Sequence, residues 1–282
     1  MKLPPFEYAC PTSLSEAVAL LALHDGEAKP MAGGQSLVPM LAFRVAAPAL
    51  IVDLRKLAEL KQIRIGEDGV TLGAMVRWCD ILDEARLQTA HPLLVEAVGQ
   101  VAHYQIRNRG TVGGSLAHAD PAAELPGIAV TCEAEIAVTG KGGTRMIAAA
   151  DFFTSALTTA LKADEIITSI RFPAWPARRR FGFLEFARRR GDFALAGVAL
   201  FYDTDEAGRA RNAHVGTIGV ADRPLRLAAV EAVLNGSAID AATIAKAAAS
   251  AAVDPLDDIH ASGTYRRALI GTLVERALTA AK

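Results

Sequence analysis

The stretch that decides the fold is Ile106–Pro121, with the sequence IRNRGTVGGSLAHADP. Its central part, Thr111–Ser115 (TVGGS), is called here the second glycine segment. Glycine permits positive φ and close approach to the backbone, so N–H groups can converge on an anion. The hydroxyls of Thr111 and Ser115 can also donate to phosphate oxygens. The segment therefore predicts one half of a phosphate-binding site.

A similar glycine pair lies nearer the N-terminus in Ala32–Ser36 (AGGQS), the first glycine segment. A short strand over Lys29–Met31 precedes it, and a helix from Leu37 to Phe43 adds the positive end of its dipole. Two such segments from separate units suit a pyrophosphate held between them. Neither has the spacing of a Rossmann or Walker motif, and glycine pairs also occur in ordinary turns. The chemistry alone leaves a dinucleotide site and two plain turns equally open.

Hydrophobic periodicity places regular elements around both segments. A helix over Thr12–His24 and a buried strand over Leu50–Asp53 complete a small βαβ-like unit with the strand that precedes the first segment. The next part of the chain predicts strands at Gln62–Ile65, Val70–Leu72, Glu135–Val138, Thr144–Ile147 and Ile166–Phe172, a glycine-rich loop at Arg109–Gly114, and helices at Trp78–Ala85, His91–Val101 and Pro121–Cys132. Asp120 is expected to cap the last of these helices.

A domain boundary is expected near Pro173–Arg180 (PAWPARRR), which is rich in proline and arginine. Beyond it we expect strands at Ala194–Tyr202 and Asn212–Ile218 and helices at Arg226–Leu234, Ala241–Ala252 and Tyr265–Ala280. The sequence thus predicts an α+β protein of three units, with residues 1–57, 58–175 and 176–282.

Composition argues against several classes of function. The 282 residues carry a formal net charge of −1, which points to neither a nucleic-acid nor a membrane partner. Cys10, Cys79 and Cys132 lie far apart, so a zinc site or an iron–sulfur cluster held by this chain alone is not expected. The N-terminus has no apolar signal core and no apolar run could span a membrane, which predicts a cytoplasmic protein.

The glycine segments also resemble a known family. Met31–Met40 and Ile106–Pro121 resemble the two flavin loops of the medium subunit of bacterial molybdenum hydroxylases. That family includes carbon monoxide dehydrogenase, the nicotine and quinoline hydroxylases, and the flavin domain of xanthine dehydrogenase. Glu165–Pro173 and Phe186–Ala196 resemble further segments of it, and the likeness runs from the first residues to Arg266-Arg267.

The resemblance implies a fold and a cofactor. The fold is a two-part FAD-binding domain of the vanillyl-alcohol-oxidase/PCMH type, a small βαβ unit beside an antiparallel sheet with helices, followed by a small α+β domain. The cofactor is FAD, with contacts implied at Lys29, Pro30, Met31, Ala32, Gly33, Gly34, Gln35, Ser36, Leu37, Val101, Thr111, Val112, Gly113, Gly114, Ser115, Glu124, Ile167, Glu185 and Phe193. His118 could reach the cofactor edge, although the role of a satisfied polar residue suits it at least as well.

Within that set, residues 29–37 and 111–115 would enclose the pyrophosphate. Glu124 would accept a hydrogen bond from a ribose or ribityl hydroxyl, and Phe193 would lie beside the isoalloxazine ring. Two positions depart from the family: Gln35 stands where some relatives have histidine, and Glu185 where some have lysine. The second departure reverses a charge and puts the family's electrostatic tuning of the flavin in doubt for this chain.

The resemblance further implies partner chains. A large subunit would carry the molybdenum cofactor and a small subunit two [2Fe-2S] clusters, and the implied assembly is a dimer of these heterotrimers. Electrons would pass from those clusters through FAD to an external acceptor, and no catalytic acid, base or metal ligand is assigned to this chain. The alternatives are a stand-alone flavin reductase of the same superfamily and a non-catalytic assembly subunit without FAD.

Three groups of arginines carry open interpretations. Arg107 and Arg109 either neutralise phosphates, contact a partner subunit or form a solvated basic turn. The run Arg178–Arg180 is predicted to be a solvated face, whereas Arg188–Arg190, beside Phe193, is a candidate interface.

Overall fold

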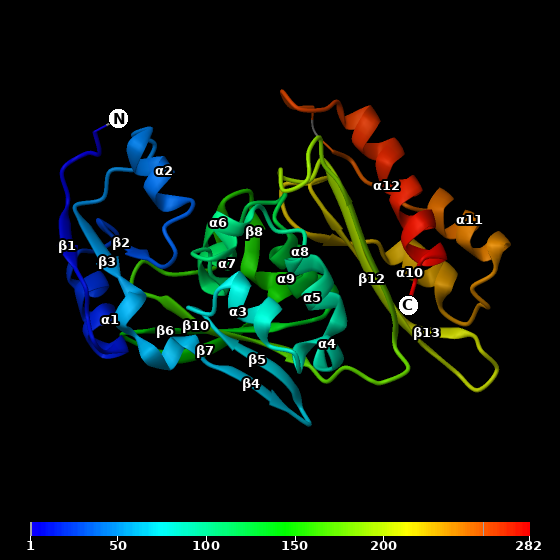
Figure 1. Ribbon diagram of the computed structural model, residues 1–282. Helices are drawn as coiled ribbons and strands as arrows, with labels where there is room; N and C mark the ends of the chain where they lie inside the picture. The colour runs from blue at the N-terminus through cyan, green and yellow to red at the C-terminus, as the bar shows by residue number, and fades with distance from the viewer. Residues whose placement is uncertain (1, 256) are drawn as a thin grey trace.

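The computed structural model describes residues 2–255 and 257–282, which form three sheets with their helices and one small hairpin (Figure 1). The N-terminal sheet has three parallel strands in the order β1-β3-β2. Its elements are β1 (Glu7–Ala9), α1 (Leu14–Leu23), β2 (Ala28–Met31), α2 (Leu37–Ala42) and β3 (Leu50–Asp53). Parallel strands must be joined by crossover connections, and α1 and α2 form the two crossovers of this sheet.

Local sequence explains why α1 begins and which face it buries. The Ser13 hydroxyl accepts the N–H of Glu16 and caps the helix, as the sequence predicts. Ala17, Val18 and Leu21 follow at helical spacing and pack into the core under the sheet. Strand β1 escaped prediction because it has only three residues, mostly exposed, without an alternating apolar pattern.

The middle of the chain forms a five-stranded antiparallel sheet in the order β4-β5-β10-β6-β7. Figure 1 shows the helices of this part gathered on one face of that sheet. Its elements are η1 (Leu54–Lys56), η2 (Ala58–Lys61), β4 (Ile63–Gly66), β5 (Gly69–Gly73), α3 (Trp78–Asp83), α4 (Leu87–Ala90), α5 (Pro92–Val98), α6 (Tyr104–Arg107), α7 (Val112–His118), α8 (Glu124–Thr131), β6 (Glu135–Gly140), β7 (Gly143–Ala148), α9 (Ala149–Phe152), the hairpin β8 (Phe153–Ser155) and β9 (Thr158–Thr159), and β10 (Ile166–Pro173).

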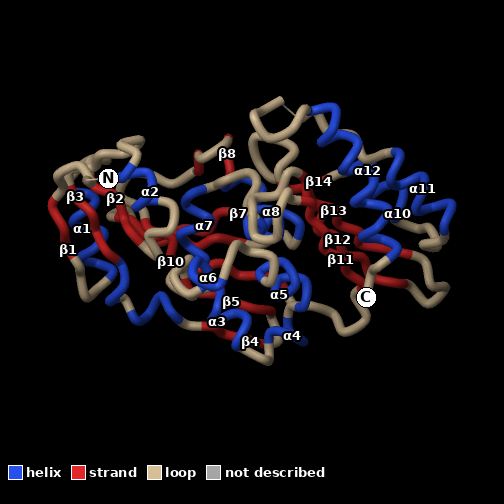
Figure 2. Tube along the Cα trace, turned by 45° about the horizontal axis from the view of Figure 1, so that its top comes forward, coloured by secondary structure: helices blue, strands red, loops and turns tan. Residues whose placement is uncertain are grey.

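The C-terminal part is a four-stranded antiparallel sheet in the order β11-β12-β13-β14, with three helices on one face. Figure 2 shows the three groups of strands side by side along the molecule. The elements are β11 (Arg180–Phe186), β12 (Ala196–Thr204), β13 (Ala210–Ile218), β14 (Leu225–Arg226), α10 (Ala228–Leu234), α11 (Ala241–Ala249) and α12 (Gly263–Thr279).

Successive side chains along these strands point to opposite faces of the C-terminal sheet, and one face packs against the middle part of the chain. Phe181, Phe183 and Phe201 face the middle helices and share one core with them. Val198 and Leu200 point the other way and pack under α10–α12. The predicted α+β class is confirmed, because helices pack on sheets that are mostly antiparallel.

One predicted helix begins later than expected. The helix predicted over Pro121–Cys132 starts at Glu124, with Ala123 as its N-cap. Asp120 does not cap it, because its carboxylate accepts the N–H of Ala122 at 2.9 Å and closes a separate turn. The N–H of Gly219 donates to the carbonyl of Pro121, and this hydrogen bond attaches the turn to the C-terminal sheet.

Two further differences between the prediction and the structure involve arginines. Arg226 is not in a helix: it pairs with Gly216 as part of β14, and α10 starts two residues later. Arg179 is not part of a solvated face, because it pairs with Asp203 at 2.9 Å and its guanidinium lies 4.2 Å from the centre of the Phe201 ring. Strand β11 begins at the end of that basic run, which hid it from prediction.

A group of hydrogen bonds made by one arginine connects the last helix to residues next to the C-terminal strands. Arg266, on α12, is buried and donates to the carbonyls of Leu195 and Gly219 and to the Asp258 carboxylate. A buried guanidinium is stable only with such partners.

Over residues 2–255 and 257–282, no helix is long and apolar enough to cross a membrane.

The central strand β10 yields a test of the shared core. Phe172 is 0% exposed and meets the His91 ring edge-on at 4.9 Å between centroids. We expect Phe172→Ala to lower the free energy of unfolding by about 3–5 kcal/mol, because it removes a large buried ring. Urea unfolding measures this, with Met146→Ala on exposed β7 as the control, expected to cost less than about 0.5 kcal/mol. Equal effects of the two substitutions would contradict the assigned core.

Candidate functional site

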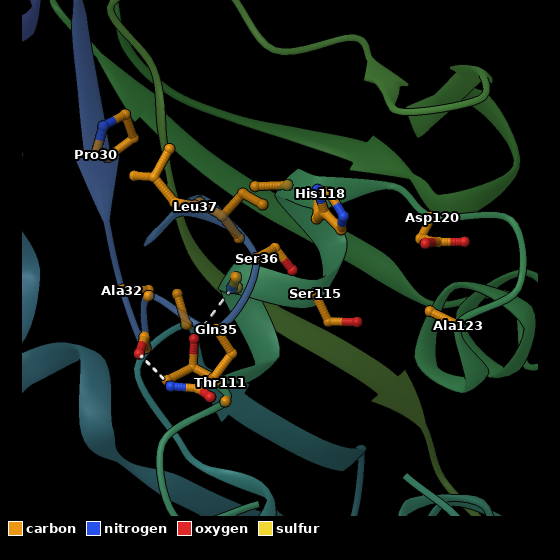
Figure 3. Close-up of a pocket in the computed structure, with 18 of the residues that line it drawn as sticks. Pro30, Ala32, Gln35, Ser36, Leu37, Thr111, Ser115, His118, Asp120 and Ala123 are labelled. Carbon is orange, nitrogen blue, oxygen red and sulfur yellow. Dashed lines mark hydrogen bonds between the residues drawn. The ribbon is translucent and has the colours of Figure 1, made fainter. Parts of the chain in front are cut away.

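A cavity of about 520 Å³ lies where the N-terminal unit, α7 and the loop after β11 meet. This volume is within the range of cofactor sites, about 300–1,000 Å³. Figure 3 shows labelled side chains of both glycine segments around one opening, with His118, Asp120 and Ala123 farther along. The structure therefore brings together two segments that the sequence predicted to act jointly.

The first glycine segment offers unpaired backbone donors. Strand β2 ends at Met31, and the chain turns through Ala32–Ser36 into α2. Gly34 has φ of +74°, in the left-handed region that favours glycine. Among the described residues, no acceptor takes the N–H groups of Gly33, Gly34, Gln35 and Ser36, and Ser36 makes no side-chain capping bond. These donors, at the start of a helix, are suited to an anion.

The second glycine segment works differently from its prediction. It is not a loop, because α7 starts at Val112 with Thr111 as its N-cap. Protein acceptors already take the N–H groups of Val112, Gly113 and Gly114, which bond to the Val76 carbonyl, the Ala74 carbonyl and the Thr111 hydroxyl. The predicted convergence of N–H groups on an anion is therefore wrong here. What this segment can still donate are the hydroxyl protons of Thr111 and Ser115.

Close packing, rather than a positive φ, explains the glycines at positions 33 and 113. A Cβ at Gly33 would overlap the carbonyl oxygen of Arg109, so this glycine lets the first segment touch the backbone just before α7. A Cβ at Gly113 would lie 2.6 Å from the Cβ of Ala74. Gly33 and Gly113, both of which the structure describes, do not have a positive φ. The lack of a side chain at Gly33 lets the first segment approach the backbone before α7, and at Gly113 it lets α7 pack against the turn after β5.

Most residues implied by the resemblance line this cavity, namely Lys29, Pro30, Ala32, Gly33, Gly34, Gln35, Ser36, Leu37, Val101, Thr111, Gly113, Gly114, Ser115, His118, Glu124, Ile167 and Phe193. Three lie outside the lining. Met31 packs behind Gly34, Val112 is fully buried in the core, and Glu185 stands on β11. Their side chains therefore belong to the support of the cavity rather than to its surface.

Sequence reasoning missed one wall of the cavity. The hairpin and the turn before β10 contribute it, with Leu157, Thr158, Thr159, Leu161, Lys162 and Ala163. Nothing in the local sequence marks these residues, because they reach the cavity only through tertiary packing. The N–H of Leu157 bonds to the Ala119 carbonyl at 3.1 Å and fixes the hairpin to the end of α7.

Burial perturbs two carboxyl groups at the C-terminal side of the cavity. Burial, and then the charge of Glu185, raise the pKa of Glu124 to about 8. Burial raises the pKa of Glu185 to about 7. Both acids therefore bind protons much more tightly than an exposed glutamate.

The loop after β11 forms the mouth of the cavity. Phe193 is 63% exposed there. Gly191, with φ of +86°, packs so closely on His103 that a Cβ would lie 2.5 Å from the imidazole Cε1. Arg188 hydrogen-bonds the Nδ1 of His260 at 2.8 Å.

Arg107 is a structural residue, because it donates to the carbonyls of Val101 and Ala102.

These residues fit FAD on the evidence of the structure itself. A row of unpaired N–H groups suits a pyrophosphate, the hydroxyl residues Thr111 and Ser115 line the same cavity, and Lys29 and Lys162 add positive charge along the lining. The cavity continues from there to an exposed aromatic ring at its mouth. No group of three His, Cys, Asp or Glu side chains within the described ranges could hold a metal ion. The site is that of a flavoprotein.

Comparison with known families places the chain more closely. Residues 4–175 match the FAD binding domain in molybdopterin dehydrogenase, and residues 182–281 match the CO dehydrogenase flavoprotein C-terminal domain. The chain belongs to the family of FAD-binding medium subunits of molybdenum hydroxylases. The resemblance expected from the two glycine segments is confirmed.

Relatives and solved structures agree over the full length. The nicotine 6-hydroxylase medium subunit of Paenarthrobacter nicotinovorans is 38% identical, covering 100% of this chain and 99% of that one. The carbon monoxide dehydrogenase medium chain of Hydrogenophaga pseudoflava is 35% identical, over 99% and 97%. A structure of carbon monoxide dehydrogenase from the latter organism superposes with a TM-score of 0.95 at 36% identity, covering 99% of this chain and 98% of that chain.

The contact between Gly33 and Arg109 yields a test of the site. We expect Gly33→Ala to lose most of its FAD, because the new methyl group must push the two glycine segments apart, at a cost of about 1–3 kcal/mol. The flavin absorbance per chain measures the retained cofactor. Gly142→Ala is the matched control, since its Cβ would meet nothing within 4 Å. Full flavin content in Gly33→Ala would refute the assignment.

Proposed function

We propose that this chain holds FAD with its pyrophosphate against the first glycine segment and delivers electrons from partner subunits to an external acceptor. The observation that carries the proposal is the run of four N–H groups, from Gly33 to Ser36, that have no acceptor among the described residues. Bound FAD supplies the electron-carrying chemistry that connects iron–sulfur clusters of a partner subunit to that acceptor. The work of the chain's own residues is to bind, orient and shield the cofactor.

Each part of the lining has a role in this proposal. Thr111 and Ser115 donate their hydroxyl protons to phosphate oxygens from the α7 side. Glu124 faces the cavity and exchanges a hydrogen bond with a hydroxyl of the cofactor's sugar or ribityl chain. Phe193 packs against the flavin ring at the mouth, where an aromatic face excludes water from one side of the ring.

The proposal places the chain within a larger assembly. As a family member it works as one subunit of a multi-subunit enzyme. We propose a large subunit with the molybdenum cofactor, a small subunit with two [2Fe-2S] clusters, and a dimer of these heterotrimers. Three free cysteines support a reducing, cytoplasmic location. Three units, residues 1–57, 58–175 and 176–282, would divide the work of cofactor binding and docking.

The absorption spectrum of the purified chain tests the cofactor. We expect oxidised-flavin bands and about one FAD per chain released by acid precipitation. A colourless chain that binds no added FAD, alone and when produced with its partner subunits, would favour an assembly subunit instead. Oxidation of NADPH by the isolated chain with its own organic substrate would favour a stand-alone reductase.

The mouth of the cavity yields a second test. We expect Phe193→Ala to raise the FAD dissociation constant by up to about tenfold, because an aromatic contact contributes about 0.5–1.5 kcal/mol beyond area burial. Fluorescence titration of the apoprotein with FAD measures it. Phe186→Ala is the control, because Phe186 is also partly exposed but meets the Tyr265 ring edge-on, outside the cavity lining. Equal affinities in both variants would remove Phe193 from the site.

A further inference from the structure

The turn over residues 160–165, between β9 and β10, forms part of the cavity wall that sequence reasoning missed. Residues 161–163 and Glu165 line the cavity, although none of them belongs to a helix or a strand. The function proposed above gives this turn no task. Its shape therefore has to come from side-chain contacts, and those contacts identify which residues control this part of the cavity.

Arg145, on β7, fixes the shape of the turn. Its Nε and Nη2 each donate to one carboxylate oxygen of Glu165 at 2.8 Å, and Nη2 also donates to the Ala160 carbonyl at 2.8 Å. The N–H of Lys162 donates to Glu165 Oε2 at 2.8 Å. The hydrogen bond from Arg145 holds the pKa of Glu165 below its usual value, so the pair is charged at neutral pH. A bidentate pair of this kind fixes the orientation of both groups.

Neighbouring elements leave room for the turn and hold it from both sides. A Cβ at Gly140, at the end of β6, would lie 2.9 Å from Glu165 Cγ, so only a glycine there leaves this carboxylate its place. The N–H of the next residue donates to Asp164 Oδ2 at 3.0 Å. On the other side, a Cβ at Gly26 would lie 3.8 Å from the Cβ of Ala163. The turn thus lies between the β6–β7 hairpin and the loop before β2.

The cavity surface that adjoins this turn is apolar. Leu54, Met75 and Ile166 line the cavity and belong to the core under the N-terminal sheet. Such a surface suits a flat ring, and a methionine sulfur makes favourable contacts with aromatic systems. Phe193, in contrast, lines the cavity from the loop after β11. The cavity therefore offers two separate places for rings, built by different parts of the fold.

We propose that the Arg145–Glu165 pair positions the wall that receives the adenosine half of FAD, and thereby makes this chain select FAD over flavin mononucleotide (FMN). The inference rests on the proposed function: the first glycine segment takes the pyrophosphate and Phe193 the flavin ring, which leaves the surface beside the turn for adenosine. Arg145 is absent from the cavity lining. It acts through the turn and is a positioning residue.

The location of the pair separates this role from general support of the fold. Strand β7 is at the edge of its sheet, and the Arg145 side chain is 40% exposed. Partly exposed ion pairs contribute little to the free energy of unfolding. Loss of Arg145 should therefore loosen the turn while the hydrophobic cores stay intact.

The test compares the binding of FAD, FMN and ADP by the full chain freed of its flavin, with isothermal titration calorimetry. In Arg145→Met we expect the dissociation constants of FAD and ADP to rise by about tenfold, whereas that of FMN, which lacks the adenosine half, should not change. Arg145→Lys keeps the charge but not the planar fork, so its loss should be intermediate. Arg171→Met is the matched control, because Arg171 pairs with Glu135 at 2.8 Å, has a 42% exposed side chain and lies outside the lining.

A second variant displaces the turn without removing a charge. In Gly140→Ala the new methyl group must push Glu165 aside, so we expect the same selective loss of FAD and ADP. Gly142→Ala, in the same hairpin, places its Cβ in open space and should bind all three ligands like the wild type. This comparison decides the question even if Arg145→Met fails to fold, which its urea unfolding midpoint would reveal.

The outcomes separate this inference from the proposed function. Equal losses for FAD, ADP and FMN in Arg145→Met and Gly140→Ala would show that the pair supports the whole cavity, and would overturn the inference. Unchanged binding of FAD and ADP in both variants would overturn it as well. A wild-type chain that binds neither FAD nor FMN would instead overturn the proposed function.

Discussion

The close approach of Gly33 to the carbonyl of Arg109 is the contact on which the site depends. At that point the N-terminal parallel sheet and the helical face of the middle sheet touch through their backbones. A side chain at residue 33 would separate them, and the cavity would lose the boundary between its two halves. The contact also sets where the unpaired N–H groups of Gly33–Ser36 stand relative to Thr111 and Ser115.

The two glycine segments have similar sequences but different physical roles. The first leaves its N–H groups without acceptors, whereas the N–H groups of Val112 and Gly113 bond to the carbonyls of Val76 and Ala74. That difference depends on β5 and the turn after it, which are remote in sequence from α7. A Gly-Gly pair beside a hydroxyl residue therefore indicates a tight backbone approach, and its neighbours decide whether a ligand or the protein takes the donors.

Periodicity and recognisable segments were enough to predict the fold class and most of the long elements, because those depend on local apolar patterns. Contacts that need tertiary information were not predictable. The Leu157 hairpin enters the cavity wall through its bond to Ala119, and Arg179 is withdrawn from solvent by Asp203. The alignment of Glu185 with Gly197 and of Gly197 with Ile218 depends on the register of three strands, which no single segment of the sequence displays.

Arg266 connects the order of synthesis to the finished site. Its guanidinium, on the last helix, holds the carbonyl of Leu195, two residues beyond Phe193 at the mouth of the cavity, and that of Gly219. The first glycine segment leaves the ribosome early, but the mouth takes its final form only after α12 has been made. A chain that lacked α12 would leave the carbonyls of Leu195 and Gly219 without this donor, close to the mouth of the cavity.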